Sequence, residues 1–486
     1  MNKKKELIML GVILIIGFYL RLSPALENRD FWYDEAFTGI LLKAPIGEMN
    51  DMIFRDVHPP LYYWLAKPVG SWFGYSAWGI RFFSVIFGML TIWSIFEIGR
   101  KMFNEKIALL AAAFCAFSPF AIQYSQEARM YALFGFLMLW ATWFFYQALT
   151  DGTKKNWILW GIFGGLSFYT HYLSLFFFIA FYFTYIFYRK IFDGKIFWKA
   201  VFAERNFYLG AGIIFLFFVS WIKIFISHIS KGNLGWIDPV DFSSLPSTIQ
   251  IFLFGHPPGI GGVPSANNFR LLFDQSSFGL LVLIFGTCLF TYLWNKNNSV
   301  RRPIFVLLGI SLGTMVLLIL LSHLNIKLYV SRYFMPAAVI FYLLFSALIV
   351  SVFSSWRSWT LSLVIFLLLL INLQSIKYTT DWSHIVGLVK DGVLKTDKII
   401  ALNPFDYTSA RYYFGEANVR YFNKNNPNED FSGWVVVGND NRLKTTEELA
   451  QYQGSLIIGD NCLKTGIENL KLEPIVLDKL SICRIR

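Results

Sequence analysis

The sequence predicts a polytopic α-helical membrane protein that carries a small extracytoplasmic α/β domain at its C-terminal end. Of its 486 residues, 56% are hydrophobic and only 15% are charged, whereas about 25% of the residues in a soluble domain are charged. Eleven apolar runs are long enough to cross a bilayer as helices. This composition holds more apolar surface than a soluble fold can bury, so a membrane protein is the expected class.

The eleven predicted spans occupy the first of two predicted domains, residues 1–375. They fall at about 6–24, 78–99, 107–122, 130–149, 157–171, 173–188, 207–227, 278–294, 303–322, 334–353 and 358–375. The first run follows three lysines, as in a signal peptide. No small-residue cleavage site comes after it, so we expect an uncleaved first span.

The charged residues predict the orientation of this domain. Residues 1–375 hold 29 Lys and Arg against 17 Asp and Glu, and 17 of these cations fall in one alternate set of loops. Cytoplasmic loops carry such an excess, so the N-terminus is expected in the cytoplasm. The expected location of the protein is the plasma membrane. An odd number of spans then places the second domain outside. Residues 376–486 hold 14 charges of each sign, so the basic excess belongs to membrane loops and does not indicate nucleic acid.

Three large segments are therefore expected outside: loops at about 25–76 and 228–277, and the domain at 376–486. In this domain TDKIIALNP, GWVVVGND and GSLIIGDN are short β-type runs ended by turn residues. DWSHIVGLVKDGV and TTEELAQYQ are typical of helices, the latter with a threonine N-cap. Four cysteines are too few for a disulfide framework. Cys462 and Cys483 could pair if the domain is extracytoplasmic.

The first outer loop contains two acidic motifs, DFWYDEA and DVHPPLYYW. Asp34 and Glu35 are neighbours, so in a helix their side chains point about 100° apart. One such carboxylate, aimed into a cleft, can take a proton from a hydroxyl; alternatively, both could simply favour a helix N-terminus. In the second motif, Pro59-Pro60 predicts the start of a helix along the membrane surface, with His58 at its head. Glu35, Asp56 and His58 could also hold a divalent cation, although no spacing here matches a zinc pattern.

Ionisable residues also lie near the predicted outer ends of the spans, where exposure to lipid would be costly. They are Arg21, Arg81, Glu127, Arg129, His171, Lys223 and Arg332. Some of them could snorkel to the interface. Three arginines from distant spans on one side, however, indicate a shared anionic partner: either the nearby acids or a phosphate, whose oxygens the planar guanidinium binds in pairs. Tyr131 and other aromatic residues nearby suit either an interface or the apolar face of a sugar.

The motifs of soluble nucleotide-dependent enzymes and hydrolases are absent from the sequence: it has no P-loop, no GxSxG and no HExxH. Chemistry at the membrane face would then need a substrate that is already activated.

In order and spacing, several strings over residues 1–350 resemble the membrane glycosyltransferases of the GT-C fold. These strings are WYDEA, DVHPPLYYWL, GIRFFSVIFGML, SPFAIQYSQEARMYAL, YTHYLSLF and SRYFMP. The branch that they resemble is glycosyltransferase family 39 and its bacterial and archaeal relatives, which include protein O-mannosyltransferases and aminoarabinose transferases.

The resemblance implies transfer of one sugar from a polyprenyl-phosphate carrier to an acceptor glycan, lipid or protein, with inversion. Asp34 matches the family's general base, and Glu35 completes that motif. Asp56 and His58 match the second motif, which lines the same cleft. Arg81, Arg129 and Arg332 match cations near the donor phosphate, and we place Glu127, Tyr131 and His171 with the substrate. Such chemistry requires no metal ion.

The sequence departs from the family at two places. The loop at 228–277 is too short for the β-trefoil domain of protein O-mannosyltransferases, and His58 stands where the aminoarabinose branch has a lysine. A different class, a transporter of lipids or solutes, remains an alternative. It would favour inverted repeats and charges at the middle of the bilayer, and the sequence shows neither. A scaffold that acts through residues 376–486 is a third alternative.

Overall fold

The computed structural model describes residues 3–22, 30–196, 199, 201–202, 204–231, 237–255, 286, 297–352, 382–392, 394, 396, 398–423, 433–459, 472–476 and 481–485. Its contacts divide the chain into two compact units. Unit 1 comprises Met1–Ser23, Arg81–Ile222 and Leu234–Lys377, and unit 2 comprises Pro24–Ile80, Lys223–Asn233 and Tyr378–Arg486.

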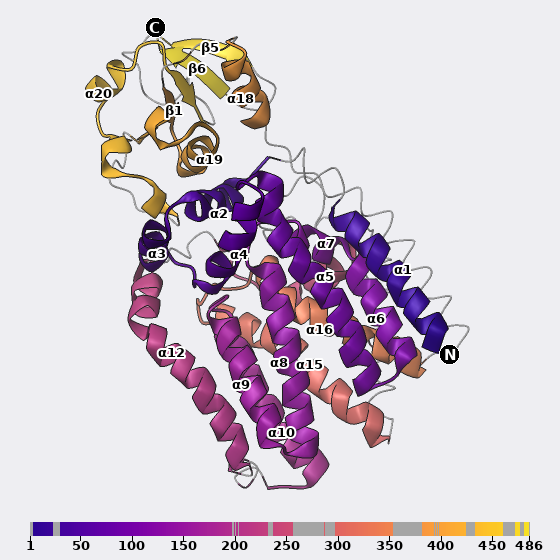
Figure 1. Ribbon diagram of the computed structural model, residues 1–486. Coiled ribbons are helices and arrows are strands. Elements are labelled where there is room, and N and C mark those ends of the chain that lie inside the picture. Colours follow the sequence, from indigo (N-terminus) through magenta and orange to yellow (C-terminus); the bar gives the residue numbers. More distant parts are fainter. Residues whose placement is uncertain are drawn as a thin grey trace. The chain divides into compact units, whose positions relative to one another are not determined.

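Unit 1 is a bundle of helices (Figure 1). Its elements are α1 (Lys3–Arg21), α5 (Ala77–Met102), α6 (Glu105–Phe117), α7 (Pro119–Ser125), α8 (Tyr131–Asp151), α9 (Lys154–Phe168), α10 (Ser174–Asp193), α12 (Arg205–Lys231), α13 (Ser244–Phe254), α15 (Asn298–Ser322), the 3-10 helix η3 (Ser331–Phe334) and α16 (Met335–Val352), with the first turn of α5 and the last turns of α12 assigned to unit 2. Helix α16 packs against α6, α8 and α15 and forms the centre of the bundle. Its apolar window is 89% buried, whereas that of α12 is only 11% buried.

The bundle confirms a polytopic helical protein but does not confirm eleven spans. Among the described residues, six helices are long and apolar enough to cross a membrane, or seven if the bent pair α6–α7 counts as one span. Helix α1 carries three lysines, a glutamate and Arg21, and α9 has only 15 residues. The predicted spans at 278–294 and 358–375 lie outside the described residues, apart from the single residue 286.

The predicted span at 107–122 is broken into α6 and α7, which meet at 62°. Ser118 has an extended backbone, and its hydroxyl accepts a hydrogen bond from the Ala121 amide as the N-cap of α7. Pro119 follows at the first helical position, where a missing N–H costs nothing. The Ser118 hydroxyl also donates to the Phe252 carbonyl and accepts from the Tyr342 hydroxyl, so α13 and α16 hold the bend in place.

The first part of unit 2 contains three short helices, α2 (Tyr33–Lys43), α3 (Ile46–Arg55) and α4 (Leu61–Trp72). Helix α4 begins directly after Pro60, as predicted, and buries Tyr62 and Tyr63. Lys67 of α4 donates to the carbonyls of Leu42 and Ala44 at the C-terminal end of α2. This contact satisfies two carbonyl groups that the helix itself leaves unpaired, and burial lowers the pKa of Lys67.

The second part of unit 2 confirms the small α/β domain. It consists of α18 (Trp382–Lys390), β1 (Ile399–Ala401), α19 (Pro404–Phe414), η5 (Glu416–Asn418), β2 (Val419–Phe422), η6 (Trp434–Val436), η7 (Asn439–Asn441), β3 (Arg442–Leu443), α20 (Thr446–Ala450), β4 (Leu456–Ile458), β5 (Leu472–Val476) and β6 (Ser481–Ile485). The sheet has the order β3-β2-β1-β4-β6-β5. Strands β1 to β4 pair in parallel, and β6 is antiparallel to β4 and β5. Ile400, Ile457 and Leu449 lie in its core.

Four of the five sequence patterns in this domain form the predicted element, and one does not. TDKIIALNP and GSLIIGDN contain β1 and β4, and the two helical patterns form α18 and α20, the latter with a capping box at Thr445 and Glu448. GWVVVGND instead forms the 3-10 turn η6, because Gly433 has φ +85° and the Val437 amide bonds back to the Trp434 carbonyl. Cys483 is disulfide-bonded. Its predicted partner Cys462 and the predicted boundary at 375/376 lie outside the described residues.

Candidate active site

The predicted site residues fall into two groups, one in each unit. Asp34 and Glu35 occupy the first turn of α2 in unit 2, where the partial positive charge of the helix terminus favours carboxylates. Glu35 is fully buried and Asp34 is half-buried. Trp32, at the N-cap, makes no side-chain capping bond. The two acids therefore do stabilise the start of a helix, and only Asp34 keeps part of its side chain accessible.

Asp56 and His58 form the second part of this group. The Nδ1 atom of His58 lies 2.7 Å from Oδ2 of Asp56, and only 2% of the Asp56 side chain is exposed, against 22% for His58. The other Asp56 oxygen, Oδ1, accepts a hydrogen bond of 3.0 Å from the Gly433 amide. The ring of His58 lies 6.4 Å from that of Phe37 on α2. The second motif is therefore a buried carboxylate that orients an imidazole beside α2.

Unit 1 gathers the other six predicted residues at the ends of its helices. Arg81, near the start of α5, is fully buried, and Glu127 and Arg129 are buried in the turn between α7 and α8. The Ser84 hydroxyl, one turn beyond Arg81, donates to the Arg129 carbonyl over 3.2 Å. The Gln123 amide donates to Glu127. Helix α5 thus brings Arg81 close to the turn that carries Arg129.

Aromatic side chains connect this turn to the third arginine. Tyr124 interacts electrostatically with both Glu127 and Arg332, and its ring lies 5.2 Å from that of Tyr131. Arg332 lies over the Tyr333 ring at 5.6 Å. We call Arg81, Glu127, Arg129 and Arg332 the basic cluster of unit 1. Three buried arginines and one buried glutamate make up this cluster, so its formal charge is positive.

His171 lies next to the basic cluster but packs as an aromatic side chain. It stacks on Phe134 at 5.2 Å and contacts Tyr333 at 4.8 Å. Its Nδ1 atom also accepts a hydrogen bond from the Leu173 amide, which fixes the ring at the α9–α10 turn. Tyr131, 6.3 Å from His171, completes this wall. Aromatic faces of this kind can pack against the apolar face of a sugar or against neighbouring helices.

Two further ionisable residues do not join the cluster in the way that the sequence suggested. Arg21 could have snorkelled to the interface, but it is fully buried and donates to the carbonyls of Gly17, Cys115 and Ala116. These bonds fasten α1 to the end of α6. Lys223 is exposed, as expected of a lysine that snorkels.

The possible metal site at Glu35, Asp56 and His58 finds no support in the geometry. Within the described ranges, no three His, Cys, Asp or Glu side chains gather closely enough to hold a metal ion. Asp56 and His58 instead pair with each other.

Two residues of unit 2 to which the sequence analysis gave no role, Asp30 and Gly433, make long-range contacts around α2. Asp30 is buried and accepts hydrogen bonds from the Ser383 amide and hydroxyl and from the Tyr413 hydroxyl. The Tyr413 hydroxyl accepts in turn from the Phe31 amide. Gly433 also makes a long-range contact, with Asp56. A glycine between Ser432 and Trp434 indicates a turn, but nothing in the sequence indicates which residue that turn contacts.

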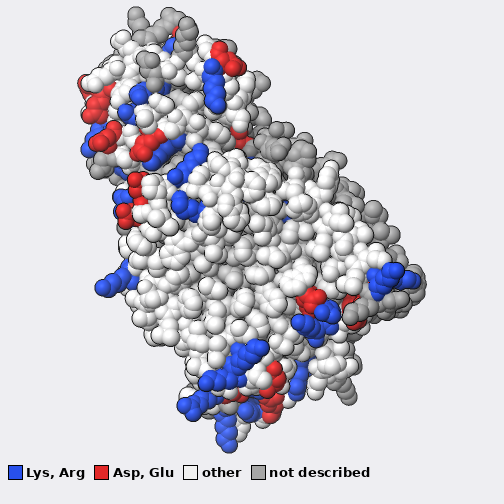
Figure 2. All heavy atoms as spheres, viewed as in Figure 1, with Lys and Arg blue, Asp and Glu red and all other residues white. Residues whose placement is uncertain are grey.

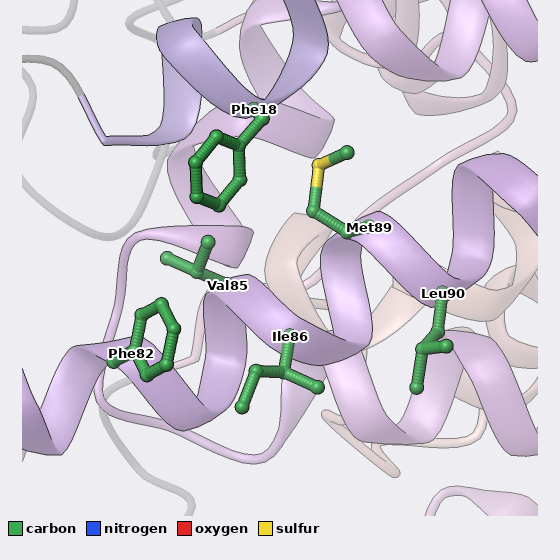
Figure 3. Close-up of a pocket in the computed structure, with 6 residues that line it drawn as sticks. All are labelled: Phe18, Phe82, Val85, Ile86, Met89 and Leu90. Atoms are coloured by element: carbon green, nitrogen blue, oxygen red, sulfur yellow. The ribbon is translucent and has the colours of Figure 1, made fainter. Parts of the chain in front are cut away.

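An apolar pocket of about 300 Å³ lies between α1 and α5 in unit 1 (Figure 3). Phe18 of α1 faces Phe82, Val85 and Met89 of α5 across it, and Ile86 and Leu90 complete the lining. The lining begins one residue after Arg81. Such a pocket can take hydrocarbon, because it offers a polar ligand no hydrogen-bonding side chain.

Comparison with known proteins confirms the resemblance seen in the sequence. The model of the dolichyl-phosphate-mannose-protein mannosyltransferase family matches residues 57–223, a stretch that includes His58, Arg81, Glu127, Arg129, Tyr131 and His171. No curated protein matches the sequence.

Solved structures extend the likeness over nearly the whole chain. The crystal structure of ArnT from Cupriavidus metallidurans in the apo state matches with a TM-score of 0.66 at 11% identity, over 98% of this chain and 97% of that one. ArnT bound to undecaprenyl phosphate matches with a TM-score of 0.52 at 12% identity, over 99% and 98%. The apo oligosaccharyltransferase of Archaeoglobus fulgidus matches with a TM-score of 0.57 at 13% identity, over 94% and 70%. At these identities the likeness to the structures shows the fold.

The solved structures and the apolar helices together show a multi-pass membrane chain with the fold of the GT-C glycosyltransferases, and about a third of the chain matches the mannosyltransferase family model.

Proposed function

We propose that the chain is a GT-C glycosyltransferase that moves a monosaccharide from a polyprenyl-phosphate carrier to an acceptor hydroxyl at the outer membrane face, with inversion. The acceptor would be a glycan, lipid or protein of the cell envelope. The observation that carries the proposal is the basic cluster of unit 1. The cluster brings three buried arginines and one glutamate together, so its formal charge is positive. A planar guanidinium binds phosphate oxygens in pairs, so the cluster suits a lipid phosphate.

The chemistry follows from the charges. The acceptor oxygen forms a bond with the anomeric carbon while its proton passes to the Asp34 carboxylate. The bond between the anomeric carbon and the phosphate oxygen breaks, and the phosphate leaves with the electron pair. Arginine side chains stabilise the charge that develops on this leaving group. A phosphate leaving group needs no general acid at neutral pH, so one positioned carboxylate is enough, in contrast to the pair that glycosidases use.

The relatives support a lipid-linked donor. One of the ArnT structures holds undecaprenyl phosphate, and the matching family is described by a dolichyl-phosphate-linked sugar. The apolar pocket beside Arg81 suits the hydrocarbon of such a carrier. We further propose that Asp56 and His58 bind the acceptor or the sugar, and that Tyr131 and His171 pack against the sugar.

The general-base role is tested by Asp34→Asn in the purified protein, assayed with a panel of undecaprenyl- and dolichyl-phosphate monosaccharides. The Asn side chain keeps the shape but cannot take a proton, so turnover should fall by about 100-fold or more. Asp51→Asn is the matched control, because Asp51 is an exposed acid on the neighbouring helix α3. Turnover of Asp34→Asn at the level of the Asp51→Asn control would rule out Asp34 as the base.

A further inference from the structure

We infer that the backbone amide of Gly433, in the C-terminal α/β domain, is a positioning group for the active site. It holds Asp56 and, through Asp56, sets the orientation of His58. The inference rests on the proposed function only where it assigns His58 a role in binding the acceptor or the sugar. The contact itself stands on unit 2 alone.

The contact is built from a buried carboxylate that uses both of its oxygens. Oδ1 of Asp56 accepts from the Gly433 amide at 3.0 Å, and Oδ2 lies 2.7 Å from His58 Nδ1. Because the Asp56 side chain is only 2% exposed, bulk water cannot replace either donor. A buried acceptor that loses its donor carries the full cost of desolvation, so the Gly433 amide stabilises one placement of this carboxylate.

Glycine is required at this position for two reasons. The φ angle of +85° lies in the left-handed region, where only glycine is unstrained. A Cβ atom added there would lie 2.7 Å from the Tyr33 hydroxyl and 3.3 Å from the Phe37 ring. Both neighbours belong to α2, the helix that carries Asp34. The turn therefore fits against α2 closely enough for its amide to reach Asp56.

A second, independent contact holds the same domain to the chain just before α2. Asp30 accepts from Ser383 at the start of α18 and from Tyr413 of α19. Helix α19 packs along α2 (Figure 1). Gly39 of α2 leaves room for the Tyr412 ring, because a Cβ atom there would lie 2.4 Å from that ring. Two polar contacts from distant parts of the domain thus flank α2, so the orientation of the Gly433 turn is fixed.

The consequence for His58 is a defined ring. When Nδ1 donates to the Asp56 carboxylate, the neutral imidazole presents Nε2 as its acceptor atom. Loss of the Gly433 amide removes a donor to Oδ1, so the placement of the carboxylate, and with it the direction of the His58 ring, becomes less strictly defined. The C-terminal domain then acts on the reaction through the geometry of the second motif, without touching the substrate.

The test measures the ring directly. Diethyl pyrocarbonate modifies neutral histidine rings, and peptide mass spectrometry gives the rate at His58 relative to exposed His384 in the same molecule. Gly433→Ala should raise the relative rate about fivefold, the change expected for the loss of one hydrogen bond. Gly454→Ala is the matched control, because Gly454 has φ +81° in the same domain with nothing within 4 Å of the added Cβ. It carries the same backbone strain and should leave His58 unchanged.

A double-mutant cycle on kcat links the contact to catalysis. Gly433→Ala should lower kcat about tenfold in the wild-type background and less than about twofold in Asp56→Ala, because coupled residues are not additive. Equal effects in both backgrounds, or an unchanged His58 rate in folded Gly433→Ala, would overturn the inference. If Gly433→Ala does not fold, hydrogen exchange decides: the Gly433 amide must lose protection in Asp56→Ala, and retained protection overturns the contact. A protein that transfers no sugar would refute the proposed function, while the labelling result would still stand.

Discussion

Arg129 is the residue at which the basic cluster can be tested most directly. It is buried in the turn between α7 and α8, and its carbonyl is held by Ser84. Arg129→Ala should raise the donor KM about 10- to 100-fold, because a hydrogen bond to a charged group contributes about 1.5–3 kcal/mol. Binding of undecaprenyl phosphate to the purified protein checks this expectation. Lys154→Ala is the control, since Lys154 is an exposed cation at the start of α9. Equal affinity in the two variants would give Arg129 a structural role.

Arg21 should behave in the opposite way. Its guanidinium donates to three main-chain carbonyls, so Arg21→Met leaves buried acceptors without donors. The variant should lose about 2–4 kcal/mol of stability and keep the donor affinity of the wild type. Unfolding in detergent, followed by circular dichroism, measures the first quantity. Arg100→Met is the control, because Arg100 forms only a part-exposed pair with Glu97. A weaker affinity for undecaprenyl phosphate would place Arg21 with the ligand.

These two arginines show how far the sequence can predict single residues. A charged residue near the end of a span is unusual, so the sequence marks both Arg129 and Arg21 as candidates for a specific role. The sequence does not indicate their contacts, because those come from other helices: Arg21 and Ala116 are 95 residues apart, and Arg129 and Ser84 are 45 residues apart. Asp30 and Gly433 gave less signal still. A buried carboxylate and a backbone amide become important only when the fold brings a second segment to them.

At the scale of elements, the crossing of α9 and α12 depends on two glycines. A Cβ at Gly161 would lie 2.6 Å from the Gly210 carbonyl oxygen, and a Cβ at Gly210 would lie 2.6 Å from that of Trp157. Small residues of this kind allow helices in membranes to approach closely. Gly210→Ala should therefore lower the melting temperature in detergent. Gly212→Ala on the same helix has nothing within 4 Å of its Cβ and gains about 1 kcal/mol of helix propensity, so it should be neutral or stabilising. A common shift in both variants would contradict the close crossing.

The elements themselves follow from the sequence where periodicity and turn residues agree. Long apolar runs became α5, α8, α10, α12, α15 and α16 with ends within a few residues of those predicted. The bend at Ser118-Pro119 and the 3-10 turn in GWVVVGND differ, because tertiary contacts decide them. Ser118 is held by α13 and α16, and Gly433 is held by Asp56. A run of apolar or β-branched residues alone does not predict such tertiary contacts.

At the scale of the whole molecule, the distribution of charge in unit 1 agrees with the predicted orientation. Lys and Arg gather at one end of the bundle, the lower end in Figure 2. Basic residues stand at the helix ends that Figure 1 places there: the last turns of α5 and α10 and the first turns of α9 and α12. Cytoplasmic loops carry this excess, and the residues of the basic cluster come from the opposite helix ends. The cluster is thereby expected at the outer face, where a lipid phosphate lies.

Two exposed positions test this orientation in intact cells. Lys155→Cys lies at the start of α9, and Glu447→Cys lies on α20 of the C-terminal domain. A membrane-impermeant maleimide should label Glu447→Cys in intact cells and Lys155→Cys only after permeabilisation, because the two residues are predicted on opposite sides. Wild-type protein provides the background, in which Cys115 is buried and Cys483 is disulfide-bonded. The reverse pattern would place the basic cluster at the cytoplasmic face. The proposed transfer at the outer face would then be wrong.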